Sequence, residues 1–340
     1  MQKRYSNEGG RKMIKLVNVS WNSTNKCNLR CKHCYASSGE AFNNELHTSE
    51  VKKKIIDELE MLNCEFLSIS GGEPFVRDDL FEIIEYAVSK KINISMVSNG
   101  TYIDMDMAKK LETLGVKRLQ ISLESAYEEE NDAVRGKGAY NKALAAIRCL
   151  SNTNIYTAVA VTPMDLNVDL DKLIQIALDN GANVVSIRRF VPMGRGKDVV
   201  NDVYSRKDFL EKVIALRSKY HNKIKITCAD PILSTLRPDI DNITKKNILG
   251  GCSAGITALA IDPIGNIKAC TRLNKVLGNV RTDKLSEVWQ HNNELKLLRN
   301  RNNLTGKCGE CNYKFICGGC RVSSFNNDGQ LMGADNDCFR

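Results

Sequence analysis

The chain has 340 residues, of which 42% are hydrophobic and 26% are charged, as in an ordinary soluble globular protein. No run of about 18 apolar residues occurs, which excludes a transmembrane helix, and the polar, basic segment Met1–Lys15 lacks the apolar core of a signal peptide. The net charge of +9 is spread along the chain without a nucleic-acid-binding motif, so we expect a cytoplasmic protein that binds neither nucleic acid nor a membrane.

Short strand-like runs alternate with helical patterns from Leu16 to about Arg188. Six βα units in series imply a parallel sheet with helices outside it, either open or curled into a full or partial barrel. In each of these folds the functional residues lie at the carboxyl ends of the strands. The predicted strands are Leu16–Trp21, Phe66–Ser70, Ile92–Ser98, Arg118–Ser122, Tyr156–Val161 and Val184–Arg188.

The pattern changes after a predicted helix at about Lys207–Tyr220. The segment from Cys252 to Arg340 has few long stretches in which apolar residues recur periodically, and it holds seven of the thirteen cysteines. Such a segment can hardly build a core alone, and metal ligation would supply the missing folding energy. We therefore expect a domain boundary between Tyr220 and Gly250.

Three cysteines, Cys27, Cys31 and Cys34, follow the first predicted strand with the spacing C-x3-C-x2-C. A chain without an export signal is unlike a disulfide-bonded protein, which leaves metal ligation or catalysis as the use of its cysteines. Three thiolates at this spacing suit a cubane cluster and leave its fourth iron open. The alternatives are unligated loop cysteines or a zinc site completed by His33 or His47.

This motif resembles that of the radical S-adenosylmethionine (SAM) superfamily, and further motifs follow in the family's order. The resemblance implies that a [4Fe–4S] cluster on the three cysteines binds S-adenosylmethionine and that one-electron cleavage gives a 5′-deoxyadenosyl radical. Gly71-Gly72-Glu73 resembles the element that meets the cofactor's ammonium group. The other residues implied at the cofactor are His33 beside the adenine, Asn99 in a polar turn, and Ser122, Glu124 and Arg135 near the ribose and the carboxylate.

The C-terminal cysteines resemble those of the SPASM domain, which carries two auxiliary [4Fe–4S] clusters. A single zinc ribbon is disfavoured because only five residues separate the two C-x2-C pairs, although two zinc sites stay open as an alternative. The resemblance implies three [4Fe–4S] clusters in all. It assigns Cys252, Cys270 and Cys320 to the nearer auxiliary cluster, and Cys308, Cys311, Cys317 and Cys338 to the outer one.

The expected fold is therefore α/β, a partial (β/α)6 TIM-like barrel with a C-terminal cysteine-rich auxiliary-cluster domain. The expected division is a polar N-terminal tail over residues 1–14, the radical SAM barrel over 15–220, a bridging segment over 221–250 and the SPASM domain over 251–340.

Three cysteines are left over by these assignments. Cys64 and Cys149 are expected in the core, because one precedes a strand and the other lies in a helical stripe. Cys228 is the candidate for a catalytic role: it could donate a hydrogen atom to a substrate radical, complete the nearer auxiliary cluster, or be a buried thiol only.

The family resemblance favours an oxidative modification of a ribosomally made peptide, such as a thioether or carbon–carbon cross-link. The expected partners are a peptide substrate, a separate leader-binding protein unless the barrel captures the peptide directly, and a flavodoxin- or ferredoxin-type electron donor. The alternatives are tetrapyrrole side-chain processing and, in another class, a non-catalytic electron carrier or zinc-stabilised binding protein. Arg188, Arg189 and Arg195 would lie at the barrel mouth, where they could bind a carboxylate of cofactor or substrate.

Overall fold

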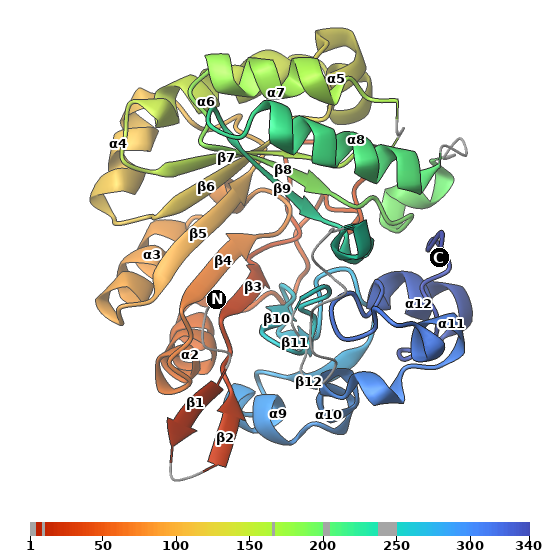
Figure 1. Cartoon of the computed structure of the whole chain (residues 1–340). Coiled ribbons are helices and arrows are strands. Elements are labelled where there is room, and N and C mark those ends of the chain that lie inside the picture. Colours follow the sequence, from red (N-terminus) through yellow and green to blue (C-terminus); the bar gives the residue numbers. More distant parts are fainter. Residues whose placement is uncertain (1–4, 9–10, 165–166, 200–204, 237–249) are drawn as a thin grey trace.

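A ten-stranded mixed sheet organises the molecule (Figure 1). The computed structural model describes residues 5–8, 11–164, 167–199, 205–236 and 250–340. The strand order is β12-β11-β10-β3-β4-β5-β6-β7-β8-β9. Its strands are β3 (Asn18–Asn22), β4 (Phe66–Ser70), β5 (Asn93–Ser98), β6 (Arg118–Ser122), β7 (Tyr156–Val161), β8 (Val184–Arg188), β9 (Lys225–Ala229), β10 (Ala258–Ile261), β11 (Asn266–Lys268) and β12 (Val276–Asn279).

The six predicted strands are present as the parallel run β3 to β8, which confirms the predicted α/β fold. Two predicted starts were wrong. β3 begins at Asn18 rather than Leu16, where pairing with Phe66 of β4 starts. β5 begins at Asn93 because the N–H of Ile92 is bonded to the carbonyl of Ala87 at the end of the preceding helix.

Two further parallel strands extend the run at its ends. β9, in the segment expected to act as a bridge, pairs with β8, and residues 237–249 of that segment lie outside the described residues. β10 comes from the C-terminal segment and pairs in parallel with β3. The C-terminal segment is therefore joined to the barrel through one continuous sheet. In the segment expected as a polar tail, β1 (Tyr5–Glu8) and β2 (Arg11–Ile14) form a separate antiparallel hairpin.

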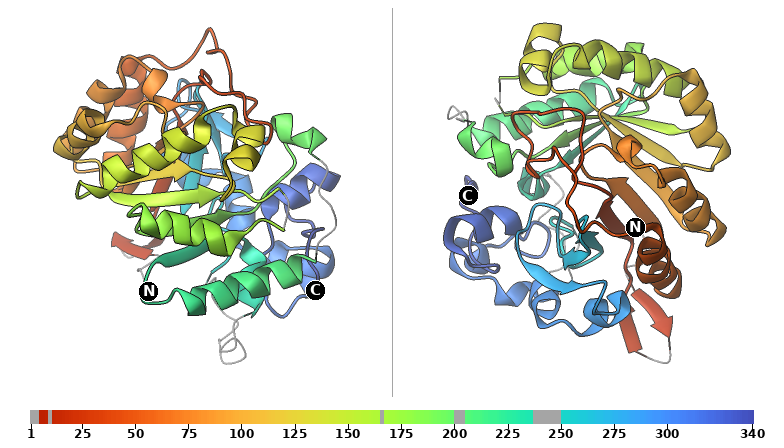
Figure 2. Two further views of the ribbon diagram at one scale, coloured as in Figure 1. Left: turned by 90° about the horizontal axis from the view of Figure 1, so that it is seen from above. Right: turned by 180° about the vertical axis from the view of Figure 1, so that it is seen from behind.

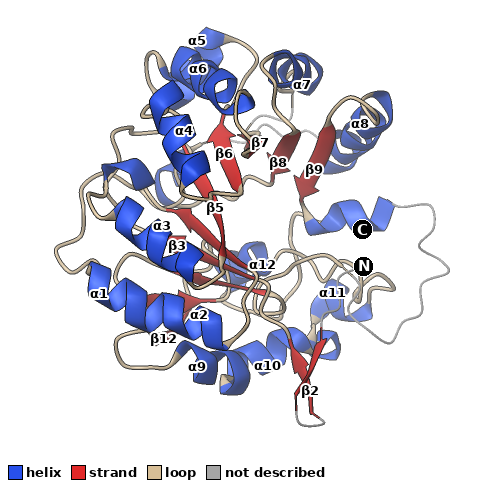
Figure 3. Cartoon of the chain, turned by 90° about the vertical axis from the view of Figure 1, so that its left-hand side faces the viewer, coloured by secondary structure: helices blue, strands red, loops and turns tan. Residues whose placement is uncertain are grey.

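Helices cover the convex side of the curved sheet (Figures 1 and 3). The predicted helix at Lys207–Tyr220 is α8, which begins one residue earlier because Ser205 caps it by accepting a hydrogen bond from the N–H of Asp208. The barrel helices are α1 (Thr48–Glu50), the π-helical turn η1 (Val51–Ile56), α2 (Asp57–Met61), α3 (Leu80–Ser89), α4 (Met105–Thr113), α5 (Glu128–Arg135), α6 (Ala139–Ser151), α7 (Leu170–Asp179) and α8 (Arg206–Lys219).

The C-terminal segment packs beside the barrel, as the blue ribbon in the two views of Figure 2 shows. After the β10–β12 strands it contains short helices separated by cysteine-bearing loops. These are α9 (Leu285–His291), α10 (Asn293–Arg299), α11 (Gly306–Glu310) and α12 (Arg321–Asp328). Short 3-10 turns complete the described elements: η2 (Pro74–Val76), η3 (Gly194–Asp198), η4 (Pro231–Leu236) and η6 (Arg301–Asn303). Within the described residues, no helix is both long and apolar enough to cross a membrane.

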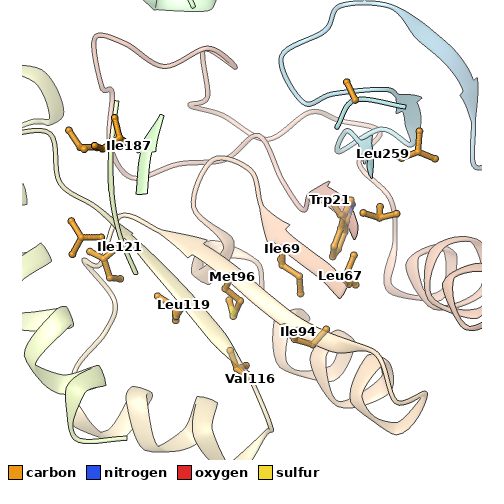
Figure 4. Close-up of a cluster of buried hydrophobic side chains, with 14 of the residues drawn as sticks. Trp21, Leu67, Ile69, Ile94, Met96, Val116, Leu119, Ile121, Ile187 and Leu259 are labelled. Atoms are coloured by element: carbon orange, nitrogen blue, oxygen red, sulfur yellow. The ribbon is translucent and has the colours of Figure 1, made fainter. Parts of the chain in front are cut away.

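The apolar core lies between the sheet and its outer helices (Figure 4). Leu67 and Ile69 of β4 and Ile94 of β5 are fully buried there with the stripe Ile83 and Ile84 of α3. Burying each such side chain contributes about 1.5–3 kcal/mol. Because side chains alternate between the two faces of a strand, the residues between these apolar positions point to the barrel interior.

The barrel interior is polar. Ser68 donates to the side-chain carbonyl of Asn18 at 2.7 Å, and its hydroxyl lies 2.6 Å from that of Ser95. Farther round the sheet, the hydroxyls of Ser186 and Thr227 lie 2.9 Å apart. In a closed TIM barrel bulky side chains fill this space as a second core. Here the interior is instead suited to hold a polar ligand.

Candidate active site

The loop that follows β3 carries Cys27, Cys31 and Cys34, all of them free thiols. Arg195, in η3 after β8, supports this loop: its Nε donates to the carbonyl of Cys31 at 2.9 Å, and its backbone N–H donates to the carbonyl of Cys34 at 3.1 Å. Burial raises the pKa values of Cys27 and Cys31. Without a metal these thiols therefore stay protonated, and a bound cationic centre would favour their thiolate forms, which are the forms that ligate metal.

The glycines after β4 allow the second motif to lie directly against the cysteine loop. The N–H of Gly72 donates to the carbonyl of Thr24 at 2.8 Å, and the N–H of Glu73 donates to that of Lys26 at 3.0 Å. A Cβ on Gly72 would stand 2.1 Å from the carbonyl oxygen of Lys26. Gly71 has φ +135°, a conformation that side chains disfavour. Only glycines permit this approach.

Glu73 is completely buried. One carboxylate oxygen accepts from Ser98 Oγ at 2.9 Å, and the other accepts from the backbone N–H of Asn99 at 2.8 Å. No cation of the described residues lies within ion-pair distance of it. Burial raises the pKa of Glu73 to about 7. A buried carboxylate with neutral partners alone is suited to bind a cationic ligand group.

The turn after β5 ties this carboxylate to the cysteine loop. Asn99 donates from its side-chain amide to the side-chain oxygen of Asn28 at 2.8 Å, and its own side-chain oxygen accepts from the N–H and hydroxyl of Thr101. Asn99 therefore holds the loop in place as well as presenting its backbone N–H to Glu73.

Glu124, just after β6, contacts two other residues expected at the cofactor. Its Oε1 accepts from Arg135 at 2.8 Å and lies 3.2 Å from Nε2 of His33, while Oε2 accepts from the N–H of Thr162 at 2.7 Å. Burial would raise the pKa of Glu124, but the charges of His33 and Arg135 and these hydrogen bonds lower it to about 2. Ser122, two residues earlier, ends β6 on the same side of the sheet.

His33 presents an unused ring nitrogen. Its Nδ1 is buried and has no hydrogen-bond partner among the described residues. An orphaned polar atom beside Glu124, which also binds Arg135, is an open ligand position. This donor set, with charges of both signs around the cysteine loop, fits a zwitterionic ligand on a thiolate-bound cluster.

The C-terminal cysteines line two separate cavities. Cys252, Cys270 and Cys320 line one of about 900 Å³, which reaches the barrel interior at Asn18 and Ser20. Cys308, Cys311, Cys317 and Cys338 line another of about 280 Å³. This grouping agrees with the three and four ligands expected of the two auxiliary clusters, whose assignment stays a prediction.

Two comparisons of sequence bear on this arrangement. A family model of the radical SAM superfamily matches residues 21–179, and a model of the SPASM iron–sulfur cluster-binding domain matches residues 252–312. An AdoMet-dependent heme synthase of Methanosarcina barkeri is 30% identical over 96% of this chain and 98% of that protein. The mycofactocin maturase MftC of Mycolicibacterium smegmatis is 34% identical over 94% of this chain and 82% of that protein.

The chain belongs to the radical SAM superfamily. It is a radical SAM enzyme with a C-terminal SPASM domain, and these domains bind S-adenosylmethionine and iron–sulfur clusters. Solved structures agree in fold at low identity. SuiB of Streptococcus suis, crystallised with S-adenosylmethionine, has a TM-score of 0.80 at 17% identity over 96% of this chain and 78% of that one. Native anSMEcpe has a TM-score of 0.69 at 17% identity, covering 93% and 92%.

The zinc alternatives find no support in this radical SAM chain. His33 lies against Glu124, and His47 caps the helix that begins at Thr48 in a capping box with Glu50. Among the described residues, no three His, Cys, Asp or Glu side chains are placed to hold a single metal ion. The thiols of a cubane stand farther apart than the ligands of one ion.

Backbone amides of the SPASM segment point at the cysteine sulfurs. The N–H of Gly319 donates to Cys317 Sγ at 3.3 Å, and that of Asp335 donates to Cys308 Sγ at 3.4 Å. Hydrogen bonds of this kind stabilise thiolate charge and tune cluster potentials. Sequence reasoning missed Asp335, although its place three residues before Cys338 was an available signal.

Asp335 also connects the barrel to both cysteine groups. Its carboxylate accepts from Arg189, which follows β8, and from the backbone N–H of Cys320 at 2.8 Å. Arg189 was expected at the barrel mouth as a ligand-binding residue. It instead forms a buried structural ion pair.

Cys228 lies on β9 and lines the larger cavity with Cys252, Cys270 and Cys320. It alternates with Thr227, which faces the barrel interior, so its side chain starts from the opposite face of the strand. Burial and Asp230 raise the pKa of its thiol to about 11. The remaining thiols, Cys64 and Cys149, are buried and half-buried on the barrel's outer side.

Proposed function

We propose that this radical SAM enzyme matures a ribosomally made peptide by oxidative modification, such as a thioether or carbon–carbon cross-link. The observation that carries the proposal is the cavity of about 900 Å³ beside the SPASM cysteines. Barrel residues such as Ser20 and Arg188 border it together with Cys252, Cys270 and Cys320, so a substrate segment inside it would meet both the barrel interior and the SPASM segment. The MftC maturase, 34% identical, supports a peptide as substrate.

The cofactor site is assigned to residues of this chain. Cys27, Cys31 and Cys34 hold the first cluster, while Glu73 takes the cofactor's ammonium group. Arg135, oriented by Glu124, takes its carboxylate. The chemistry that the bound cofactor and cluster supply is one-electron cleavage of the sulfonium to a 5′-deoxyadenosyl radical. Glu73 and Glu124 are both buried, so bulk water is kept from this position.

The SPASM cysteines hold two auxiliary clusters in this proposal, giving three in total. Net oxidation of a substrate leaves an electron to be removed, and a cluster next to the cavity can accept it. A flavodoxin- or ferredoxin-type donor supplies the electron that starts each turnover, and a separate leader-binding protein presents the peptide. The three cavity cysteines and the amide-to-sulfur hydrogen bonds of the outer group support this arrangement.

Tetrapyrrole processing is the second candidate. A specific observation favours it: the heme synthase of M. barkeri aligns over 98% of its own length, against 82% for MftC. The cofactor site assigned above serves both candidates, which differ in the substrate and in the bond that is changed.

The first experiment measures the iron content per chain and the cleavage of S-adenosylmethionine after anaerobic purification and reconstitution. Three cubane clusters correspond to about twelve irons per chain. Cys27→Ala, Cys31→Ala and Cys34→Ala should each lose about four irons and all 5′-deoxyadenosine formation with dithionite. Cys149→Ala, which alters a half-buried thiol of α6, is the matched control and should keep both. A colourless, zinc-containing protein would refute the assignment.

The second experiment identifies the substrate. The enzyme is co-expressed with each short open reading frame beside its gene, and the peptides are examined by mass spectrometry. A peptide that loses two hydrogen atoms, only when Cys27 is intact, supports the proposal. Conversion of an iron porphyrin but of no peptide would contradict it and favour the second candidate.

A further inference from the structure

Three arginines lie at or after the end of β8, and the side chains of two of them form hydrogen bonds within the protein. Arg189 is paired with Asp335, and Arg195 binds carbonyl groups of the cysteine loop. Arg188 is the remaining member of this group. Its position differs from the others because it is the last residue of β8 and faces the barrel interior, as Ser186 does.

Arg188 projects into the larger cavity. It lines that cavity together with Ser20, and its Nη2 donates to the side-chain oxygen of Gln120 at 2.8 Å. The four preceding residues of β8 are buried, whereas Arg188 is exposed. Since Arg188 lines the cavity, this exposure is toward the cavity. Among the described residues, no carboxylate lies within ion-pair distance of its guanidinium.

Further positive charge surrounds Arg188. Burial, Arg272 and Arg118 together lower the pKa of Arg188 to about 10. Nη2 of Arg118 lies 3.5 Å from Oγ of Ser186 in the barrel interior. Arg118 also has no carboxylate partner among the described residues. Asp230 also lines the cavity, but it is paired with Arg206, so the unpaired charges beside Arg188 are positive and favour an anion.

A fourth arginine at this cavity, Arg272, also forms a hydrogen bond within the protein. Arg272 lies two residues after Cys270, lines the same cavity, and donates to the carbonyl of Arg189 at 2.6 Å. For Arg188, by contrast, the side chain of Gln120 is the one hydrogen-bond partner among the described residues.

We propose that Arg188 binds a carboxylate group of the substrate inside the larger cavity. This inference rests on the proposed function in one respect, that the cavity holds the substrate. Gln120 fixes one side of the guanidinium and leaves its other N–H groups free to form a bidentate pair with a carboxylate. The carboxylate belongs to an acidic side chain or C-terminus of a peptide, or to a propionate of a tetrapyrrole.

The test uses the reconstituted holoenzyme with saturating S-adenosylmethionine, so that the cofactor site is filled. Binding of 4-fluorobenzoate to the unreduced enzyme, which leaves S-adenosylmethionine intact, is followed by the broadening of its fluorine NMR signal as the small probe exchanges with the slowly tumbling protein. Arg188→Gln should weaken binding at least tenfold, because a charged hydrogen-bonded pair contributes about 1.5–3 kcal/mol. The neutral 4-fluorobenzamide should bind wild type and variant equally weakly.

Arg217→Gln is the matched control. Arg217 of α8 lines the same cavity, so this change removes the same charge from its outer rim and should leave probe binding unchanged. Arg188→Lys keeps the charge but loses the planar fork, and should bind with intermediate affinity at wild-type iron content. That variant carries the test if Arg188→Gln does not fold.

Equal broadening of the benzoate signal by wild type and Arg188→Gln would overturn the proposal. So would a loss of iron in both Arg188 variants with probe binding unchanged, which would make Arg188 a cluster-supporting residue. Competition then identifies the source of the carboxylate. An N-acetylated tripeptide acid is compared with its amide, and a propionate-bearing porphyrin with its methyl ester.

Displacement by the peptide acid alone supports the peptide proposal. Displacement by the porphyrin acid alone leaves the role of Arg188 standing but contradicts the proposed peptide function. Displacement by neither acid would overturn the assignment of this site to the substrate.

Discussion

The guanidinium of Arg189 donates two hydrogen bonds of 2.7 Å to the two carboxylate oxygens of Asp335, which lies 146 positions later in the chain. Both side chains are fully buried. Through its backbone and carboxylate, Asp335 also contacts Cys308 and Cys320, which belong to different cysteine groups. One ion pair therefore fixes the barrel and both auxiliary sites relative to each other.

Replacing Asp335 by Asn should reduce the free energy of unfolding by about 2–4 kcal/mol, because a buried guanidinium loses its main counter-charge. Burial would raise the pKa of Asp335, but Arg189 lowers it, so this stabilisation is present at neutral pH and is lost in acid. Anaerobic urea unfolding of the holoenzyme measures the effect. Asp337→Asn, in the same network but with a side chain 42% exposed, should cost less than about 1 kcal/mol.

Replacing Glu124 by Gln should destabilise the protein by about 3 kcal/mol at pH 7, since its pKa of about 2 lies below the usual value of about 4.3. A depressed carboxyl pKa stabilises the folded state above pH 4.3, and this contribution is lost as the pH falls toward 2. The difference between wild type and variant should therefore shrink by about half at pH 3. Urea unfolding at both values checks this, with the exposed Glu128→Gln as control. An unchanged difference would contradict the ionised state of Glu124.

Binding of S-adenosylmethionine should depend on pH through Glu73. With a pKa of about 7, its ionised fraction falls about tenfold from pH 8 to pH 6. Pairing with an ammonium group requires the ionised form, so the affinity should fall about tenfold over the same range, with proton release on binding near pH 7. Calorimetry in buffers of different ionisation enthalpy measures both. Glu73→Gln should bind more weakly and without this pH dependence; a persisting dependence would implicate another group.

Replacing Gly72 by Ala should displace the cysteine loop, because the added Cβ meets the backbone carbonyl of Lys26. The expected cost is about 1–3 kcal/mol, together with reduced occupancy of the first cluster, seen as fewer irons per chain. Gly39→Ala is the control in the same loop. There the added Cβ meets only the flexible end of Arg30, which can move aside. Full iron content in Gly72→Ala would show that the loop has room to relax.

Local sequence patterns predicted most of the barrel. The bounds of β4, β6, β7 and β8 coincide with the predicted runs, because alternation of polar and apolar residues marks a strand directly. The motif residues Glu73 and Glu124 lie at strand ends because parallel strands bring their carboxyl ends to one edge. The radical SAM and SPASM identities followed from the resemblance of these motifs and of the cysteine spacing to the two families.

The pairing of strands that are distant in the chain could not be predicted from local patterns. β10 has four residues and joins β3 from about 240 positions away, and no local signal specifies that partner. The different roles of the neighbouring arginines could not be predicted from the sequence either. Arg188, Arg189 and Arg195 look alike in sequence, and only the fold shows that one meets Asp335, one meets loop carbonyls and one lines the larger cavity.

The parallel pairing of β10 with β3 imposes an order on biosynthesis. β3 leaves the ribosome early, but the strand that covers its outer edge is made only in the last quarter of the chain. Until then β3 presents an open hydrogen-bonding edge beside a loop of unliganded thiols, a combination prone to association with other chains. Completion of this edge of the barrel, and with it protection of Cys27, Cys31 and Cys34, must therefore wait until β10 has been made.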